Sequence, residues 1–155
     1  MSPRTVGELT IREVPLLPQE EQVGSAVRKI IDAGVPALPV MGGDGRLAGI
    51  FGEREFINAI FPGYMGQLHY AGFVTKATDE VLEKNAGSAT APVSDYMNTE
   101  HVDVGPDYSD AQLAETFMHH RVLVIPVADE GRVTGIVTRW DFFRALAERL
   151  LERSS

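Results

Sequence analysis

Residues 125–141 read IPVADEGRVTGIVTRWD and contain the pattern that decides the fold. An apolar run that starts at Val122 ends at a turn, Asp129-Glu130-Gly131, and a second apolar run, Val133 to Val137, follows. Two apolar segments joined by a short turn with glycine are typical of a β-hairpin. Apolar residues then recur at helical spacing from about Arg139 to Leu151, which predicts a helix directly after the hairpin.

The same pattern occurs earlier in the chain. Shifting the sequence by 87 positions places Pro126 on Pro39 and Val122 on Val35, with a shift of 86 after the turn. Each copy is preceded by a helical pattern, and the first of these stops at Gly34, a residue typical of helix ends. An internal repeat of this length predicts two copies of one structural unit. The unit we expect is strand, helix, strand, strand, helix.

Residues 125–141 closely resemble the signature end of a CBS (cystathionine-β-synthase) domain, and residues 38–51 are similar to a more diverged copy. The resemblance implies an α+β fold in which two CBS repeats pack with pseudo-two-fold symmetry, an arrangement called a Bateman module.

The expected boundaries follow from the repeat. The first repeat spans residues 1–61, a linker or insertion spans 62–92, and the second repeat spans 93–155. Within the linker we expect a short helix at Asp79 to Lys84. The aromatic residues Tyr64, Tyr70 and Phe73 are expected to be packing anchors, with a dimer contact or a ligand lid as the alternatives.

What the resemblance implies for function is regulation without catalysis. CBS pairs commonly bind AMP, ADP, ATP or S-adenosylmethionine in two clefts between the repeats, and they commonly form homodimers. We therefore expect an adenine nucleotide as regulatory ligand, a homodimer, and a protein partner that the sequence does not identify. Neither a catalytic residue nor a catalytic cofactor is expected. A ligand-free interaction scaffold, or a dimerisation module, is the alternative.

The residue pair Thr138 and Asp141 opens the last predicted helix. Spacing alone favours a helix cap, in which the threonine hydroxyl accepts a backbone N–H of the first turn. The CBS resemblance implies a ligand role instead, with Thr138 near phosphate and Asp141 on the ribose hydroxyls. Arg139 would add positive charge beside them.

Family architecture implies that each cleft is completed by the other repeat. The walls of the Thr138/Asp141 cleft would then come from two segments of the first repeat: Val14, Pro15, Leu16, Val35, Pro36 and Ala37. The matching positions of the first repeat hold Gly52 and Glu55, which supply no hydroxyl and a longer carboxylate. This second cleft would add the following residues of the second repeat: Val102, Asp103, Arg121, Val122 and Leu123.

Composition narrows the classes of function that remain possible. The formal net charge of −8 opposes broad binding to nucleic acid or to an anionic membrane. The chain has no cysteine, and its longest apolar run is far too short to cross a bilayer, so a cytoplasmic location is expected. His119-His120 cannot face one metal ion from adjacent helix positions, and no metal site is expected. The segment Gly42 to Gly45 is interpreted as a hairpin turn, and Ser109 as a helix cap.

Overall fold

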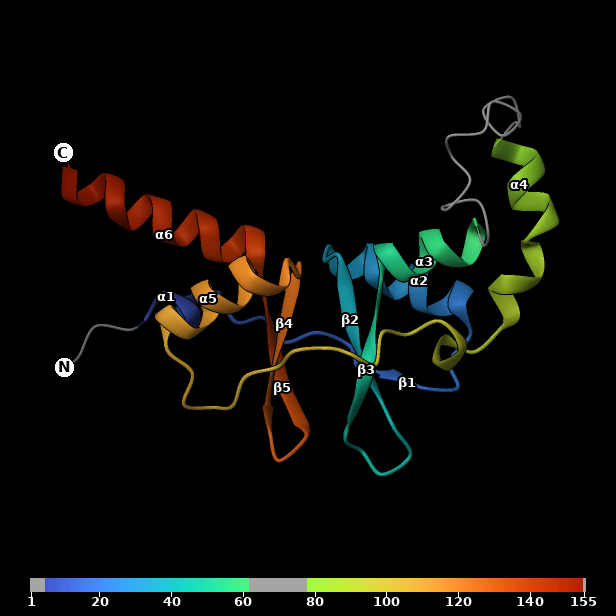
Figure 1. Cartoon of the computed structure of the whole chain (residues 1–155), viewed down its shortest axis with the longest axis horizontal. Coiled ribbons are helices and arrows are strands. Elements are labelled where there is room, and N and C mark those ends of the chain that lie inside the picture. The colour runs from blue at the N-terminus through green and yellow to red at the C-terminus, as the bar shows by residue number, and fades with distance from the viewer. Residues whose placement is uncertain (1–4, 62–77, 155) are drawn as a thin grey trace.

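Two β-hairpins lie side by side at the centre of the molecule, with their turns pointing the same way (Figure 1). The structure is a computed structural model and describes residues 5–61 and 78–154. The first half contains α1 (Val6–Thr10), β1 (Leu17–Pro18), α2 (Val23–Ala33), β2 (Ala37–Met41), β3 (Leu47–Gly52) and α3 (Glu53–Ile60). The second half contains α4 (Thr78–Lys84), η3 (Ala86–Thr90), η4 (Val93–Asp95), α5 (Asp110–His120), β4 (Val124–Asp129), β5 (Arg132–Thr138) and α6 (Arg139–Ser154). The fold is therefore the predicted α+β arrangement of two CBS-type repeats.

Local sequence signals account for most element ends. Helix α2 ends at Gly34, whose φ of 68° is in the left-handed region that glycine tolerates. Helix α5 begins after Ser109, whose hydroxyl accepts the backbone N–H of Gln112. The Gly42–Gly45 segment connects the antiparallel strands β2 and β3. These three predictions are confirmed, whereas the anchors expected at Tyr64, Tyr70 and Phe73 lie outside the described residues.

The first strand of the unit differs between the repeats. In the first repeat, β1 pairs in parallel with β2, and the N–H of Gln19 extends the ladder to the Met41 carbonyl at 3.0 Å. In the second repeat, the matching segment makes only an isolated bridge between Val104 and Val127. Pro106 stands where the first repeat has Gln19 and has no N–H to donate. The expected strand is therefore shortened to a bridge.

The initial segments of the two repeats are exchanged in space. Helix α1 packs against α6 and α5, and Val6 belongs to the core cluster of the second repeat. Conversely, Val93 is fully buried in the cluster of the first repeat. The chain crosses between the repeats at Arg12, which bridges Ile136, and again at Asn98, which bridges Ile50.

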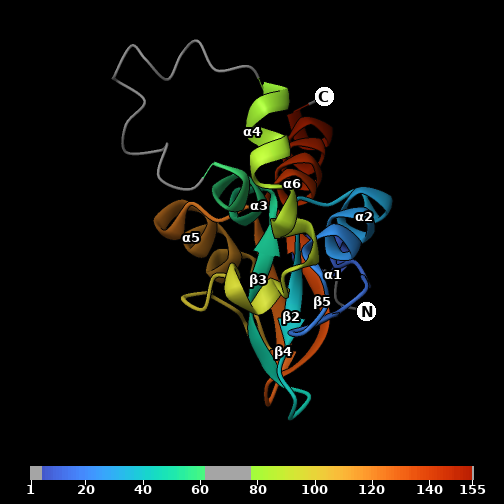
Figure 2. The same cartoon turned by 90° about the vertical axis from the view of Figure 1, so that its right-hand side faces the viewer.

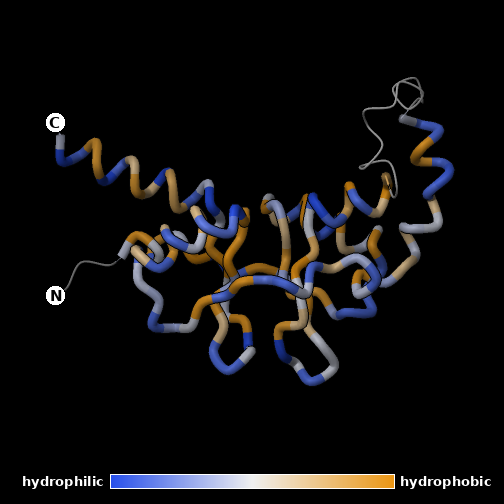
Figure 3. Tube along the Cα trace, in the orientation of Figure 1, coloured by the Kyte–Doolittle hydropathy of each residue, from blue (hydrophilic) through white to orange (hydrophobic). Residues whose placement is uncertain are grey.

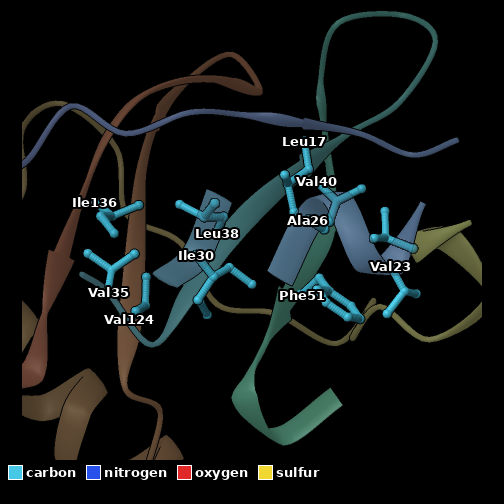
Figure 4. Close-up of a cluster of buried hydrophobic side chains, with 12 residues drawn as sticks. Leu17, Val23, Ala26, Ile30, Val35, Leu38, Val40, Phe51, Val124 and Ile136 are labelled. Atoms are coloured by element: carbon cyan, nitrogen blue, oxygen red, sulfur yellow. The ribbon is translucent and has the colours of Figure 1, made fainter. Parts of the chain in front are cut away.

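The larger core cluster also joins the two repeats. Val124 and Ile136 of the second hairpin lie beside Val35 at the edge of a cluster formed mainly by α2, β2 and β3 (Figure 4). Apolar positions follow the strands, while both hairpin turns are hydrophilic (Figure 3). The two repeats therefore share one packed interface. Within residues 5–61 and 78–154, no helix is long and apolar enough to cross a membrane.

Candidate ligand clefts between the two repeats

An open cavity of about 840 Å³ lies between the repeats, where the start of α3 meets the end of α5. Helices α3 and α5 lie on one side of the strands in Figure 2, and α1 and α2 on the other. The apolar part of the wall comes from both hairpins and the residues just before them, from α3 and from the segment before α5: Pro36, Ala37, Ile50, Ile57, Val102, Val122, Leu123 and Val124. Its polar part consists of Glu53, Arg54, Glu55, Asn58, Tyr96, Asn98, His101, Arg121 and Arg139.

Three arginine side chains in this wall come from three different elements. Arg54 belongs to α3, Arg121 follows α5, and Arg139 begins α6. In the part of the chain that the structure describes, none of the three forms a salt bridge within 4.0 Å. Guanidinium groups without a carboxylate partner are suited to bind an anion, and phosphate in particular.

Arg121 has an unfavourable backbone conformation. Its φ of 52° and ψ of 31° are left-handed, and Gly34 occupies the same helix-end position in the first repeat with φ of 68° and ψ of 34°. A side chain in this region costs about 1–2 kcal/mol relative to the ordinary helical region. Strained residues of this kind concentrate at functional sites. The arginine is thus held at the cavity despite a conformational cost.

The carboxyl group of Glu55 is half-buried at the start of α3 and accepts the Gly52 N–H at 2.9 Å. Burial raises the pKa of Glu55 above its ordinary value. Gly52 has no room for a side chain, because a Cβ atom there would overlap Ala37 and the Pro36 carbonyl oxygen. This packing explains why the first repeat has no counterpart to the Thr138 hydroxyl.

His101 lines the same cavity and has one nitrogen available. Its side chain is mostly buried, and its Nδ1 atom is buried without a hydrogen-bond partner among the described residues. The other ring nitrogen lies 3.9 Å from the Asp103 carboxylate. A buried polar atom without a hydrogen-bond partner is costly.

The Thr138/Asp141 pair lies at the N-terminus of α6 and is buried. The Thr138 hydroxyl accepts the Asp141 N–H at 3.1 Å, which is the capping geometry. Both carboxylate oxygens of Asp141 accept hydrogen bonds from Arg12, at 2.5 Å from Nε and 2.9 Å from Nη2. The hydrogen bond from Arg12 holds the pKa of Asp141 below its ordinary value, and the one from Thr138 lowers it further.

In the structure, the residues that the sequence assigns to each cleft do not all lie together. Three of those assigned to the Thr138/Asp141 cleft line the open cavity instead: Pro36, Ala37 and Arg139. The others lie elsewhere, with Val35 in the core, Val14 packed against it, and Pro15 and Leu16 exposed. Of those assigned to the Gly52/Glu55 cleft, five line the cavity: Glu55, Val102, Arg121, Val122 and Leu123. Gly52 caps α3, and Asp103 is exposed beside His101.

Sequence reasoning missed Arg12, Arg54, Tyr96 and His101. The sequence did contain a signal for two of them. Arg54 stands next to Glu55 at the start of a predicted helix, and the repeat register aligns His101 with Val14, which was assigned to the other cleft. The contact between Arg12 and Asp141 could not be predicted from the sequence, because it depends on the exchange of the initial segments between the two repeats.

Two fused α+β units of similar topology, with an open cavity between them, define a tandem-repeat module. The chain belongs to the CBS domain family, whose model matches residues 6–62 and 93–148.

Curated relatives are distant. An uncharacterised protein of Methanocaldococcus jannaschii, MJ1426, is 26% identical over 123 residues, which are 72% of this chain and 73% of the relative. An A-adding tRNA nucleotidyltransferase of Geobacter sulfurreducens is 27% identical over 141 residues, but the match spans 91% of this chain and only 13% of the enzyme. This chain therefore matches only a small part of that enzyme.

Solved structures show the same fold at low identity. The acetoin utilization protein AcuB of Vibrio cholerae superposes with a TM-score of 0.70 at 19% identity, covering 96% of this chain and 93% of that one. CBSX2, crystallised in complex with AMP, has a TM-score of 0.66 at 18% identity, covering 93% and 96%. MJ1225 of M. jannaschii, described as an archaeal homolog of the AMPK γ subunit, has a TM-score of 0.69 at 18% identity, covering 89% and 48%.

Proposed function

We propose that this CBS pair is a regulatory module that binds an adenine nucleotide or S-adenosylmethionine between its repeats and signals to a protein partner. The observation that carries the proposal is the open cavity of about 840 Å³ with three arginine side chains in its wall. The proposal includes no catalytic step. It does include that the protein forms a homodimer and acts in the cytoplasm.

The wall of the cavity offers a suitable group for each part of a nucleotide. Apolar residues such as Pro36 and Leu123 suit the faces of a purine, and the size is within the range of small-molecule sites. Arg121 and Arg139 can pair with phosphate oxygens, and an ionised Glu55 can accept hydrogen bonds from ribose hydroxyls. The AMP complex of CBSX2 supports the proposal by analogy of fold.

Signalling follows from the position of the cavity. A ligand that touches α3 and the end of α5 contacts both repeats at once. Binding can then favour one relative arrangement of the repeats, by as much as its affinity differs between arrangements. The Thr138/Asp141 cleft, to which the sequence assigns Val14, Pro15 and Leu16, is only a second candidate position, because Arg12 already occupies the Asp141 carboxylate.

A ligand-free scaffold is the second candidate. It is favoured by the pairing of Arg12 with Asp141, because that carboxylate is already satisfied without a ligand. In this case the protein would bind its partner equally well with and without nucleotide.

The deciding experiment is calorimetric titration of nucleotide-free protein with AMP, ADP, ATP and S-adenosylmethionine. We expect a dissociation constant on the order of micromolar for at least one ligand. Arg121→Gly fits the left-handed conformation, so it keeps the fold while it removes one guanidinium group. This variant should weaken the binding of phosphate-bearing ligands by at least about tenfold, and the binding of S-adenosylmethionine by less.

The control is Arg132→Ala, which removes an arginine at the tip of the second hairpin, away from the cavity. Equal losses of affinity in both variants would indicate a general effect of charge and would contradict the open cavity as the binding site. No heat with any of the four ligands would overturn the sensor and favour the scaffold.

A further inference from the structure

The segment that crosses from α1 to β1 places one arginine in the second cleft. The backbone of Arg12 is fixed on β5, since its N–H donates to the Ile136 carbonyl at 2.8 Å and its carbonyl accepts the Ile136 N–H at 2.9 Å. From this anchored position its guanidinium group binds both oxygens of Asp141. The arginine is therefore held in place by the backbone and by the side chain.

The guanidinium group uses the same acceptors that a ribose would need. A ribose diol donates two hydrogen bonds to a carboxylate, and a bidentate guanidinium fills the same two oxygen positions. The Asp141 side chain is only 9% exposed, so it has little room for a further partner. A nucleotide could bond to Asp141 only after Arg12 had left it.

The open cleft has no such occupant. Its carboxylate, Glu55, forms no salt bridge within 4.0 Å in the described part of the chain, and its Oε1 accepts the backbone N–H of Gly52. The crossing segment on that side has Asn98, whose backbone bridges Ile50 as that of Arg12 bridges Ile136. The two clefts thus have equivalent backbones, but only one contains a cation bound to its carboxylate.

We infer that Arg12 acts as an internal occupant of the Thr138/Asp141 cleft, so that the protein binds one nucleotide per chain, in the open cleft. The inference rests on the proposed function, because it concerns a second nucleotide position in the same molecule. A ligand must replace a bidentate charge-assisted contact to enter the closed cleft. Its affinity there is lower by roughly ten- to a hundredfold than in a protein without Arg12.

The test is the binding stoichiometry of wild type and Arg12→Met, measured by calorimetry with ATP and with AMP. Methionine keeps the apolar stem and the backbone bridge but removes the guanidinium group. We expect one site per chain in wild type and two in Arg12→Met. Adding Asp141→Asn to Arg12→Met should return the number of sites per chain to one. Arg132→Met, at the tip of the second hairpin, is the matched control and should bind as wild type does.

The outcomes separate this inference from the proposed function. One site in both proteins, or two in wild type, overturns the role of Arg12 and leaves the nucleotide sensor standing. No site in wild type and one in Arg12→Met overturns the open cleft as the site but supports Arg12. No site in either overturns both. Arg12→Lys, which keeps the charge but not the bidentate geometry, serves if Arg12→Met does not fold, and should show a second site of intermediate affinity.

Discussion

At the scale of single residues, the carboxylate of Asp141 shows how one side chain can connect distant parts of the chain. It is buried at the N-terminus of α6, where its own N–H is capped by Thr138, and Arg12 neutralises it from the other repeat. A buried carboxylate without that partner would destabilise the fold. The pair therefore ties the first segment of the chain to its last helix.

This pairing predicts a pH-dependent stability. The pKa of Asp141 is lowered by Arg12, so the stabilisation is fully present above the ordinary pKa of an aspartate. It is lost as the pH falls through the lowered pKa and the carboxylate becomes protonated. Since Arg12 is 42% exposed, solvent screening keeps the loss in Arg12→Met at neutral pH to about 1–2 kcal/mol.

The measurement is urea denaturation of wild type and Arg12→Met between pH 7 and pH 3. The difference in free energy of unfolding should be largest near neutral pH and should shrink toward pH 3. A difference that stays constant over this range would show that the contribution of Arg12 is packing by its stem, not its charge.

Residue identities at the clefts were only partly predictable from sequence. The helix start at Thr138 and Asp141 and the cavity residues Glu55 and Arg121 follow from the repeat register. The assignment of Arg139 to the Thr138/Asp141 cleft did not anticipate that this residue lines the other one. At a helix start, a shift of one position rotates a side chain by about 100°. Spacing along the chain therefore does not determine which side of the interface a residue faces.

At the scale of elements, the crossing segments depend on a glycine in each hairpin. A Cβ atom at Gly135 would lie 2.7 Å from the Arg12 carbonyl oxygen and 2.9 Å from Cγ1 of Ile11. At Gly49 it would lie 2.9 Å from the Asn98 carbonyl oxygen and 3.0 Å from Sδ of Met97. Both glycines are required by close approach of another backbone, at equivalent positions of the two repeats.

We therefore expect Gly135→Ala to lower the free energy of unfolding by about 1–3 kcal/mol, because the crossing backbone must move to admit a methyl group. Gly49→Ala should cost less, since its Cβ atom would lie 2.9 Å from the nearest backbone oxygen, against 2.7 Å at Gly135, and the flexible Met97 side chain can adjust. The measurement is the midpoint of urea unfolding at neutral pH.

Gly43→Ala is the control for this pair, because nothing lies within 4 Å of a Cβ atom there. It should change stability by less than about 0.5 kcal/mol. Equal effects of Gly43→Ala and Gly135→Ala would contradict the close approach as the reason for Gly135.

Elements were predicted well where the signal is local. Hairpins, helix ends and the Ser109 cap follow from turn residues and apolar spacing, and so does the short helix α4, observed from Thr78 instead of Asp79. The exchange of α1 and η4 between the two cores was not predictable, because Val6 and Val93 read as ordinary apolar residues in either repeat. Only long-range packing decides which core receives them.

At the scale of the whole molecule, the most exposed apolar surface is on the helices and not at the hairpin tips. Helix α6 projects away from the body in Figure 1, and several of its large apolar side chains are exposed: Trp140, Phe143, Leu146, Leu150 and Leu151. Met118 of α5 is also exposed, at 77%. Apolar patches of this kind on a protein surface mark interaction sites. The homodimer that the CBS resemblance implies would cover them.

We expect the protein to sediment as a dimer, with α6 in the interface. Leu150→Glu adds a charge to the exposed face of α6, and burying an unpaired carboxylate in an interface is costly, so the dimer should dissociate. Sedimentation velocity over a wide range of protein concentration measures this directly. Leu82→Glu, which adds the same charge to an exposed position of α4, is the matched control and should remain dimeric. A wild type that sediments as a monomer at every concentration would contradict the dimer. A Leu150→Glu variant as dimeric as the control would place the interface on a surface other than α6.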